Sequence, residues 1–167
     1  MAHVKLKGNP VTLKQEFIKV GSVAPHFTLI DQQLKECSLK DLGKKKKLLY
    51  IVPSLDTEVC LLSTKHLNTV AKENAHLQIV VISADLPFAQ KRACGIEKLD
   101  NIKTLSMMRD KSFAQNYGVL IVDGPLTGLC ARAIIVLDEQ NKVLYTQLVG
   151  EITEEPKYEP ALAALKT

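Results

Sequence analysis

The fold is constrained most strongly by short, continuous apolar runs that alternate with segments of helical periodicity. Three such runs are Leu48–Val52, Ile79–Ile82 and Ala133–Leu137. Apolar runs of this length, without a polar residue at every second position, are typical of strands that are covered on both faces. Between the first two runs, apolar residues recur every three or four positions and predict a helix over 58–74. The sequence therefore indicates a layered α/β domain.

The remaining segments complete this prediction. Turn residues at Gly8–Pro10 between short alternating runs predict an N-terminal hairpin, 4–7 with 11–13. Asp85 is a good helix N-cap, and Gly95 is expected to end the helix that follows it. The further elements expected along the chain are strands at 27–30, 102–105 and 143–146 and helices at 110–117 and 157–166. We expect one domain over residues 1–167, with a central mixed β-sheet flanked by helices, an order compatible with a thioredoxin-like fold.

Composition and charge argue against several classes of protein. The chain is 46% hydrophobic and 24% charged with a net charge of +4, as is ordinary for a globular protein. We find no apolar run long enough to span a bilayer and no secretory signal, so we expect a cytoplasmic protein without a membrane partner. The basic run Lys44–Lys47 contains no interleaved aromatic residue, and we interpret it as a solvated loop, not a nucleic-acid site.

The chain has four cysteines, and their spacing limits their chemistry. Cys37, Cys60, Cys94 and Cys130 form no C-x-x-C pair, and the histidines do not cluster with them in sequence. We therefore expect neither a metal site nor a bound cofactor. In a reducing compartment, isolated cysteines are either buried apolar side chains or redox-active ones.

The surroundings of Cys60 favour a reactive cysteine. If a helix begins at Thr57 or Glu58, Cys60 lies in its first turn, where free backbone N–H groups and the helix dipole favour a thiolate. Thr57 precedes it by three residues, so its hydroxyl is expected to face the sulfur, and Pro53 is expected to shield the sulfur from water. A purely structural interpretation stays open, with Thr57 as an N-cap, Pro53 as a strand terminator and Cys60 as apolar filling.

The pattern P-x-x-x-T-x-x-C from Pro53 to Cys60 is one of several segments that resemble a known family. The chain resembles the thiol peroxidases, the atypical two-cysteine branch of the peroxiredoxins, over nearly its whole length. The other segments that carry the resemblance are Gly8–Thr12, Ser83–Gln90 with Arg92 and Cys94–Gly95, Gly124–Leu126, Ala131–Ala133, and Glu151–Thr153 with Glu155–Pro156.

This resemblance implies a fold, a reaction and a set of residues. It implies a thioredoxin fold with an N-terminal hairpin, usually in a homodimer, that reduces hydrogen peroxide and organic hydroperoxides with thioredoxin as the electron donor. By position, Cys60 is the peroxidatic cysteine and Cys94 the resolving one, and the two form the redox disulfide. Thr57, Arg132 and Pro53 complete the active site. Because the two cysteines belong to different predicted helices, we expect one or both helix ends to unwind when the disulfide forms.

Some residues depart from the family or have no clear role in it. Glu58 stands where relatives often have Pro or Gly, and we expect it to point to solvent. Ala93 replaces a frequent Phe, which is expected to loosen the helix end that carries Cys94. Cys37 and Cys130 are interpreted as structural. Arg109 is the second candidate for the role of Arg132, and Met107, Met108 and Leu120 are candidates for the wall of a substrate pocket.

Two other functions remain compatible with the sequence. A peroxide sensor or redox relay would use the same disulfide to oxidise a partner protein, and only steady-state turnover distinguishes it from a peroxidase. A non-catalytic binding module with a thioredoxin fold would not need Cys60 at all, and the combination of Thr57, Cys60 and Arg132 argues against it.

Overall fold

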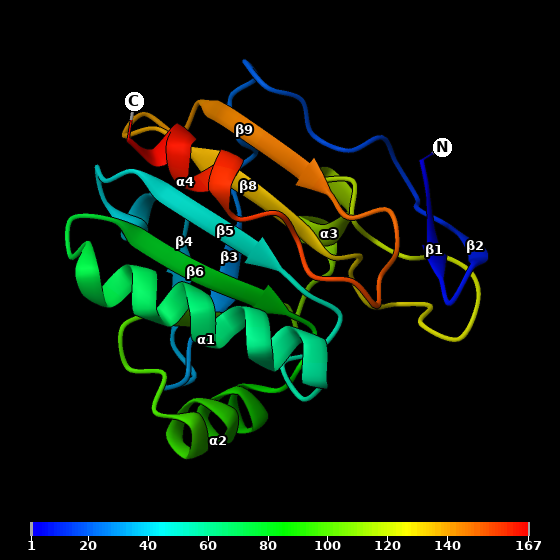
Figure 1. Ribbon diagram of the computed structural model, residues 1–167, viewed down its shortest axis with the longest axis horizontal. Coiled ribbons are helices and arrows are strands. Elements are labelled where there is room, and N and C mark those ends of the chain that lie inside the picture. The colour runs from blue at the N-terminus through cyan, green and yellow to red at the C-terminus, as the bar shows by residue number, and fades with distance from the viewer. Residues whose placement is uncertain (1, 167) are drawn as a thin grey trace.

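A computed structural model describes residues 2–166 as a sheet with helices on both faces and a separate N-terminal hairpin (Figure 1). The hairpin consists of β1 (His3–Leu6) and β2 (Asn9–Thr12), and the sheet has the strand order β4-β3-β7-β6-β5-β8-β9. Its strands are β3 (Thr28–Ile30), β4 (Glu36–Ser38), β5 (Lys47–Ile51), β6 (Gln78–Ser83), β7 (Lys103–Ser106), β8 (Ala133–Leu137) and β9 (Val143–Leu148). The helices are α1 (Glu58–Glu73), α2 (Pro87–Glu97), α3 (Ser112–Asn116) and α4 (Glu159–Leu165), with a 3₁₀ turn at Lys40–Leu42.

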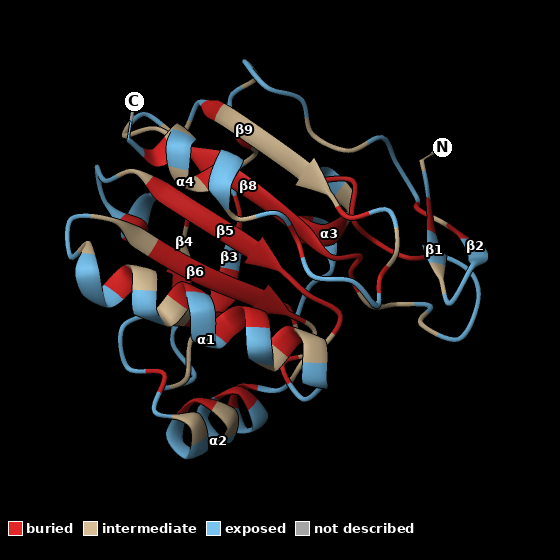
Figure 2. Cartoon of the chain, viewed as in Figure 1, coloured by how far each residue is buried: buried red, intermediate tan, exposed pale blue. Residues whose placement is uncertain are grey.

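The central strands of the sheet are buried on both faces, as their continuous apolar sequences predict. The expectation of a solvated loop over Lys44–Lys47 was wrong for Lys47, which begins β5, is fully buried and donates from its ammonium group to the Lys45 carbonyl at 2.9 Å. β5 pairs in parallel with β6 and antiparallel with β8, so the sheet is mixed. These three strands form the buried centre of the molecule (Figure 2). Among the described residues, no helix is long and apolar enough to cross a membrane.

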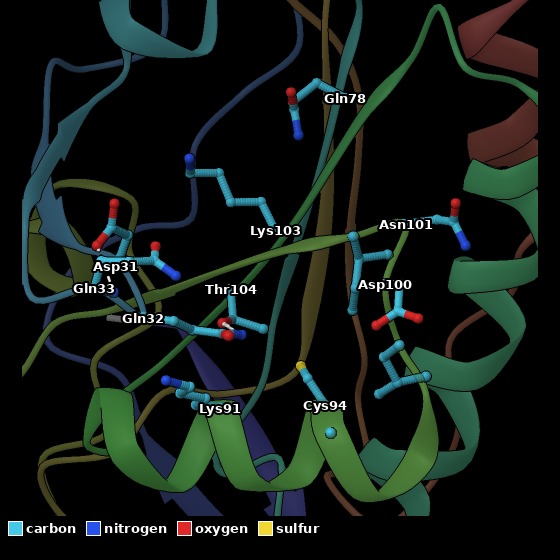
Figure 3. A pocket seen from close by; sticks show the side chains of 13 residues that line it. Asp31, Gln32, Gln33, Gln78, Lys91, Cys94, Asp100, Asn101, Lys103 and Thr104 are labelled. Carbon is cyan, nitrogen blue, oxygen red and sulfur yellow. Dashed lines mark hydrogen bonds between the residues drawn. The ribbon is translucent and has the colours of Figure 1, made fainter.

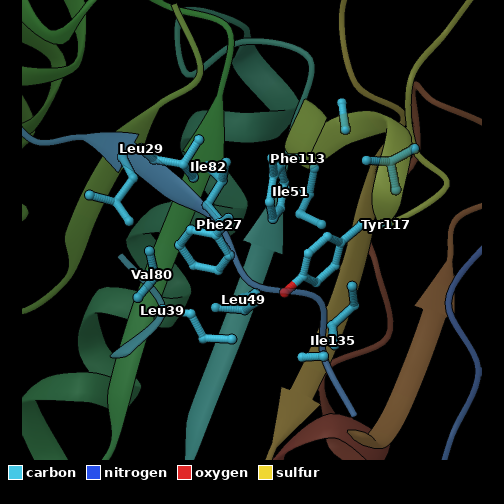
Figure 4. Packing of buried hydrophobic residues seen from close by; sticks show 14 of the residues in the cluster. Phe27, Leu29, Leu39, Leu49, Ile51, Val80, Ile82, Phe113, Tyr117 and Ile135 are labelled. Atoms are coloured by element: carbon cyan, nitrogen blue, oxygen red, sulfur yellow. The ribbon is translucent and has the colours of Figure 1, made fainter. Parts of the chain in front are cut away.

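Alternate residues of β5 contribute to two different cores. Leu48 and Tyr50 face α1 and α4, together with Cys60. Leu49 and Ile51 face the opposite way, into a core that α3 and the aromatic side chains of Phe27, Phe113 and Tyr117 cover (Figure 4). Successive residues of β5 therefore point alternately to the face of the sheet that carries Cys60 and to the opposite face.

The hairpin is joined to the segment that follows β9. The Lys5 N–H donates to the Gly150 carbonyl at 2.7 Å, and the Ile152 N–H donates to the Lys5 carbonyl at 2.8 Å. The Glu151 carboxylate accepts hydrogen bonds from the N–H groups of Lys7 and Gly8, each at 2.9 Å. The hairpin thus fixes the backbone around Ile152.

Two expectations about α2 were wrong. Gly95 does not end this helix, which continues to Glu97 and is capped by Lys98 in the left-handed conformation, φ 55°. Asp85 is not its N-cap, because Leu86 holds that position and the Asp85 carboxylate bonds elsewhere. A single glycine is tolerated inside a helix, and the Lys98 N–H closes the end by donating to the carbonyls of Cys94 and Gly95.

The other predicted elements are present, with boundaries shifted by a few residues. The helix expected at 110–117 is restricted to Ser112–Asn116, and the one at 157–166 to Glu159–Leu165. The short strand β4 was not predicted at all. It lies at the edge of the sheet beside β3, and its three residues are too few to show an alternating pattern.

Candidate active site

Cys60 lies in the first turn of α1, as the sequence predicts. Thr57 is the N-cap of this helix, so Cys60 is its third helical residue. The first four N–H groups of a helix lack an intrahelical acceptor, and the N–H of Cys60 is one of them. The side chain of Cys60 is fully buried in the core beneath β5 and β8.

Arg132 contacts the sulfur of Cys60. It immediately precedes β8 and is 2% exposed. Its Nη1 lies 3.0 Å from the Cys60 sulfur, and its Nε and Nη2 donate to the Ile152 carbonyl at 3.1 Å and 2.9 Å. Burial opposes the positive charge, but the neighbouring Tyr50 and Cys60 outweigh it and raise the pKa of Arg132. The contact therefore places a buried positive charge beside the sulfur.

Tyr50 is a member of this cluster that the sequence analysis missed. Its hydroxyl accepts a second hydrogen bond from Arg132 Nη1 at 2.9 Å. The sequence signal is weak, because Tyr50 stands inside an apolar run and fits a buried strand as a large side chain. The hydroxyl group of Tyr50 was the signal that could have indicated its role, since a buried tyrosine hydroxyl usually has a hydrogen-bond partner.

The loop before α1 is fixed by Asp85, which lies just after β6. One carboxylate oxygen of Asp85 accepts from the Ser54 hydroxyl at 2.7 Å, and the other accepts from the Leu55 N–H at 2.7 Å and the Ser83 hydroxyl at 2.7 Å. Pro53, in this loop, is buried as expected. The Thr57 hydroxyl is exposed and donates to the Ser54 carbonyl at 3.1 Å, so in this structure it does not make the predicted contact with the sulfur.

Cys94 lies on α2 and is also a buried thiol, but its environment differs from that of Cys60. It faces a polar surface pocket of about 660 Å³ (Figure 3). Burial raises the pKa of the Cys94 thiol, against hydrogen bonds with Gln32 and Thr104 that lower it. Gln32 in turn donates to the Thr104 hydroxyl at 2.7 Å. Cys94 is thus held as a thiol on the side of α2 that faces β7.

Two contacts connect the end of α2 to α1. Lys65 on α1 forms an ion pair with Glu97 on α2 at 2.5 Å. The Asn101 N–H, in the loop after α2, donates to the Asn68 side-chain oxygen on α1 at 2.9 Å. A movement of Cys94 toward Cys60 would disturb these two contacts and the hydrogen bond between Gln32 and Thr104.

The structure separates other candidates from this site. Arg109 is exposed, which removes it as a substitute for Arg132, and Glu58 is exposed as expected. Cys130 lies in the opposite core, with its sulfur 3.6 Å from that of Met107, and burial raises the pKa of Cys130 to about 12.

Two of the three residues suggested for the pocket wall were wrong. Met107 and Leu120 belong to the core on the far side of the sheet from Cys60. Met108 is half-buried after β7, and Cys37 is buried on the edge strand β4. Among residues 2–166, no group of three or more His, Cys, Asp or Glu side chains is arranged to hold a metal ion.

The mixed sheet, with a cysteine at a helix start beside a buried arginine, defines a thioredoxin-like cysteine protein, and comparisons with known proteins agree with this class. The sequence profile of the Redoxin family matches residues 19–162. A curated thiol peroxidase of Leptospira interrogans is 49% identical over 98% of this chain and 97% of its own. The chain belongs to the redoxin family and, within it, to the thiol peroxidases.

Solved structures resemble the chain over almost its full length. A peroxiredoxin-like protein from Aquifex aeolicus has a TM-score of 0.93 and 41% identity, covering 98% of this chain and 95% of its own. A thiol peroxidase from Chromobacterium violaceum has a TM-score of 0.91 and 28% identity, with the same coverage of both chains.

Proposed function

We propose that this protein is a thiol peroxidase that reduces hydrogen peroxide and organic hydroperoxides to water and alcohols, with the sulfur of Cys60 as the nucleophile. The observation that carries this proposal is the 3.0 Å contact between Arg132 Nη1 and that sulfur, made by two buried side chains. A fixed positive charge at a buried sulfur stabilises the thiolate, which is the reactive form.

In the first step, the Cys60 thiolate attacks one oxygen of the hydroperoxide. The S–O bond forms as the O–O bond breaks, which gives a sulfenic acid and, after protonation of the departing oxygen, water or an alcohol. Arg132 and the Cys60 N–H are positioned to stabilise the charge that develops on the oxygens. Because Cys60 is fully buried, the first turn of α1 must open to admit the substrate, and this movement can also turn the Thr57 hydroxyl inward.

In the second step, the Cys94 sulfur attacks the sulfenic acid of Cys60, and a disulfide forms with the loss of water. The C-terminal turn of α2 must then separate from Gln32, Thr104 and α1. The disulfide is reduced by an external dithiol, which we propose to be thioredoxin.

We propose that the working form is a cytoplasmic homodimer of single-domain subunits. Exposed apolar side chains on α2 and just before it support the dimer, because apolar side chains that form a contiguous exposed patch mark interaction sites. They are Leu86, Phe88 and Ile96, exposed by 54%, 65% and 66%. Sedimentation of wild type against Phe88→Ser tests this: the variant should shift to monomer, and a monomeric wild type contradicts it.

Peroxide consumption coupled to thioredoxin and its reductase tests the reaction. Cys60→Ser should abolish turnover, and Cys94→Ser should consume about one equivalent of peroxide per subunit and then stop. Cys37→Ser, at another buried cysteine, is the matched control and should keep wild-type turnover. Turnover that survives Cys60→Ser would contradict the proposal, whereas a wild type that reacts once and is not recycled would point to a redox sensor.

A further inference from the structure

We infer that Tyr50 is a positioning residue for the peroxidase reaction, whose hydroxyl holds the guanidinium of Arg132 against the sulfur of Cys60. This inference rests on the proposed function and names a residue that neither the family motif nor the apolar pattern assigns. Tyr50 is fully buried, and it faces the same side of β5 as Cys60.

The guanidinium is held at both of its edges. Nε and Nη2 donate to the same atom, the Ile152 carbonyl oxygen, so the rigid planar group can still pivot about that oxygen. Nη1 carries two hydrogens. One is directed at the Cys60 sulfur at 3.0 Å and the other at the Tyr50 hydroxyl oxygen at 2.9 Å. Tyr50 therefore fixes the direction of the Arg132 Nη1 hydrogen bond to the Cys60 sulfur.

The hydroxyl of Tyr50 is oriented to accept from Arg132. A guanidinium has donors only, so the Tyr50 oxygen is the acceptor in the 2.9 Å hydrogen bond with Arg132 Nη1. Burial raises the pKa of Tyr50 even though Arg132 lowers it, so this tyrosine stays neutral and acts as an acceptor near pH 7.

Removing this oxygen leaves a buried N–H of Arg132 without its acceptor. The guanidinium is then free to rotate about its remaining contacts with Ile152, and its interaction with the Cys60 thiolate weakens. A hydrogen bond to a charged group contributes enough to stabilise the thiolate by about threefold to thirtyfold, and the rate of oxidation follows the thiolate that is correctly placed.

Tyr50→Phe tests the inference, with Tyr117→Phe as the matched control. Tyr117 is equally buried, and its hydroxyl donates to the Pro25 carbonyl at 2.7 Å, but it lies in the core on the opposite face of the sheet. Both variants lose one buried tyrosine hydroxyl and should lose similar stability. Only Tyr50→Phe should shift the pH midpoint of Cys60 alkylation upward and slow single-turnover oxidation by hydrogen peroxide, by about threefold to thirtyfold.

A purely structural role for Tyr50 predicts the same pH midpoint and oxidation rate for both variants, and that result overturns the inference. If Tyr50→Phe does not fold, Tyr50→Met replaces it, because a flexible apolar side chain fills the buried space and removes the same hydroxyl oxygen. This variant should shift the alkylation midpoint in the same direction, and an unchanged midpoint overturns the inference. Alkylation of Cys60 does not require peroxide turnover. A wild type without peroxidase activity would therefore refute the proposed function, while the alkylation midpoints would still test the role of Tyr50.

Discussion

Arg132 donates a 3.0 Å hydrogen bond to the sulfur of Cys60 across 72 residues of sequence. The fold makes this contact by bringing the start of α1 and the start of β8 to the same end of β5. Because Ile152 holds the other edge of the guanidinium, the hairpin that fixes Ile152 also supports the active site.

Replacing Arg132 by lysine should lower the rate of Cys60 oxidation by about a hundredfold or more. Lysine keeps the charge, but a single ammonium group cannot bond the Ile152 carbonyl, the Tyr50 hydroxyl and the sulfur in the same planar geometry. Stopped-flow oxidation by hydrogen peroxide measures this rate. Arg109→Lys, at an exposed position, is the control and should react like wild type. A near wild-type rate for Arg132→Lys would mean that charge alone is sufficient.

Asp85→Asn should destabilise the protein by about 1–3 kcal/mol and slow the peroxidase reaction. The two carboxylate oxygens accept from Ser54, Leu55 and Ser83, and an amide offers one acceptor and places an NH₂ group against a donor. Urea unfolding measures the loss of stability. Asp56→Asn, exposed in the same loop, should change it little. Equal stability of the two variants would show that the loop does not depend on Asp85.

The sequence predicts best those features that depend on local patterns. The strand at Leu48–Val52 and the helix start before Cys60 were predicted because continuous burial and helix periodicity leave a clear signature. Tyr50 was missed because its role depends on an arginine that lies 82 residues away. The direction of the Thr57 hydroxyl was wrong for a similar reason: it follows from a loop whose backbone is fixed by Asp85, a residue on another strand end.

Glu151 should make the attachment of the hairpin depend on pH. Hydrogen bonds from the N–H of Gly8, and from Lys7 and Thr153, lower the pKa of Glu151 to about 2, against an opposing effect of burial. Since the folded-state pKa lies below the ordinary value of 4.5, the carboxylate stabilises the folded state above pH 4.5 and loses this effect as the pH falls toward 2.

Thermal unfolding of wild type and Glu151→Gln between pH 7 and pH 2 measures this contribution. Wild type should be the more stable protein at pH 7, and the difference should shrink below pH 4.5 and vanish near pH 2. Glu154→Gln, at an exposed neighbouring position, should follow wild type throughout. A difference between wild type and Glu151→Gln that does not change with pH would mean that the charge of Glu151 is not involved.

Lys98→Gly should slow the formation of the disulfide without changing the oxidation of Cys60. Lys98 caps α2 with φ 55°, a conformation that costs a non-glycine residue about 1 kcal/mol and that glycine adopts freely. Glycine keeps the cap's N–H bonds to the carbonyls of Cys94 and Gly95, so the turn that we propose to open for Cys94 becomes harder to unwind. Removing about 0.5–1 kcal/mol of backbone strain stabilises the closed helix end by the same amount. Disulfide formation that requires this end to open should then be about two- to fivefold slower.

The two steps can be followed separately by rapid mixing with hydrogen peroxide, first as loss of the Cys60 thiolate and then as loss of the Cys94 thiol. Lys7→Gly is the matched control, since Lys7 also has a positive φ, 50°, but lies in the hairpin turn, away from α2. It should relieve the same kind of strain and leave both rates unchanged. If Lys98→Gly forms the disulfide as fast as wild type, the C-terminal turn of α2 does not limit the reaction, and the opening must take place at the start of α1.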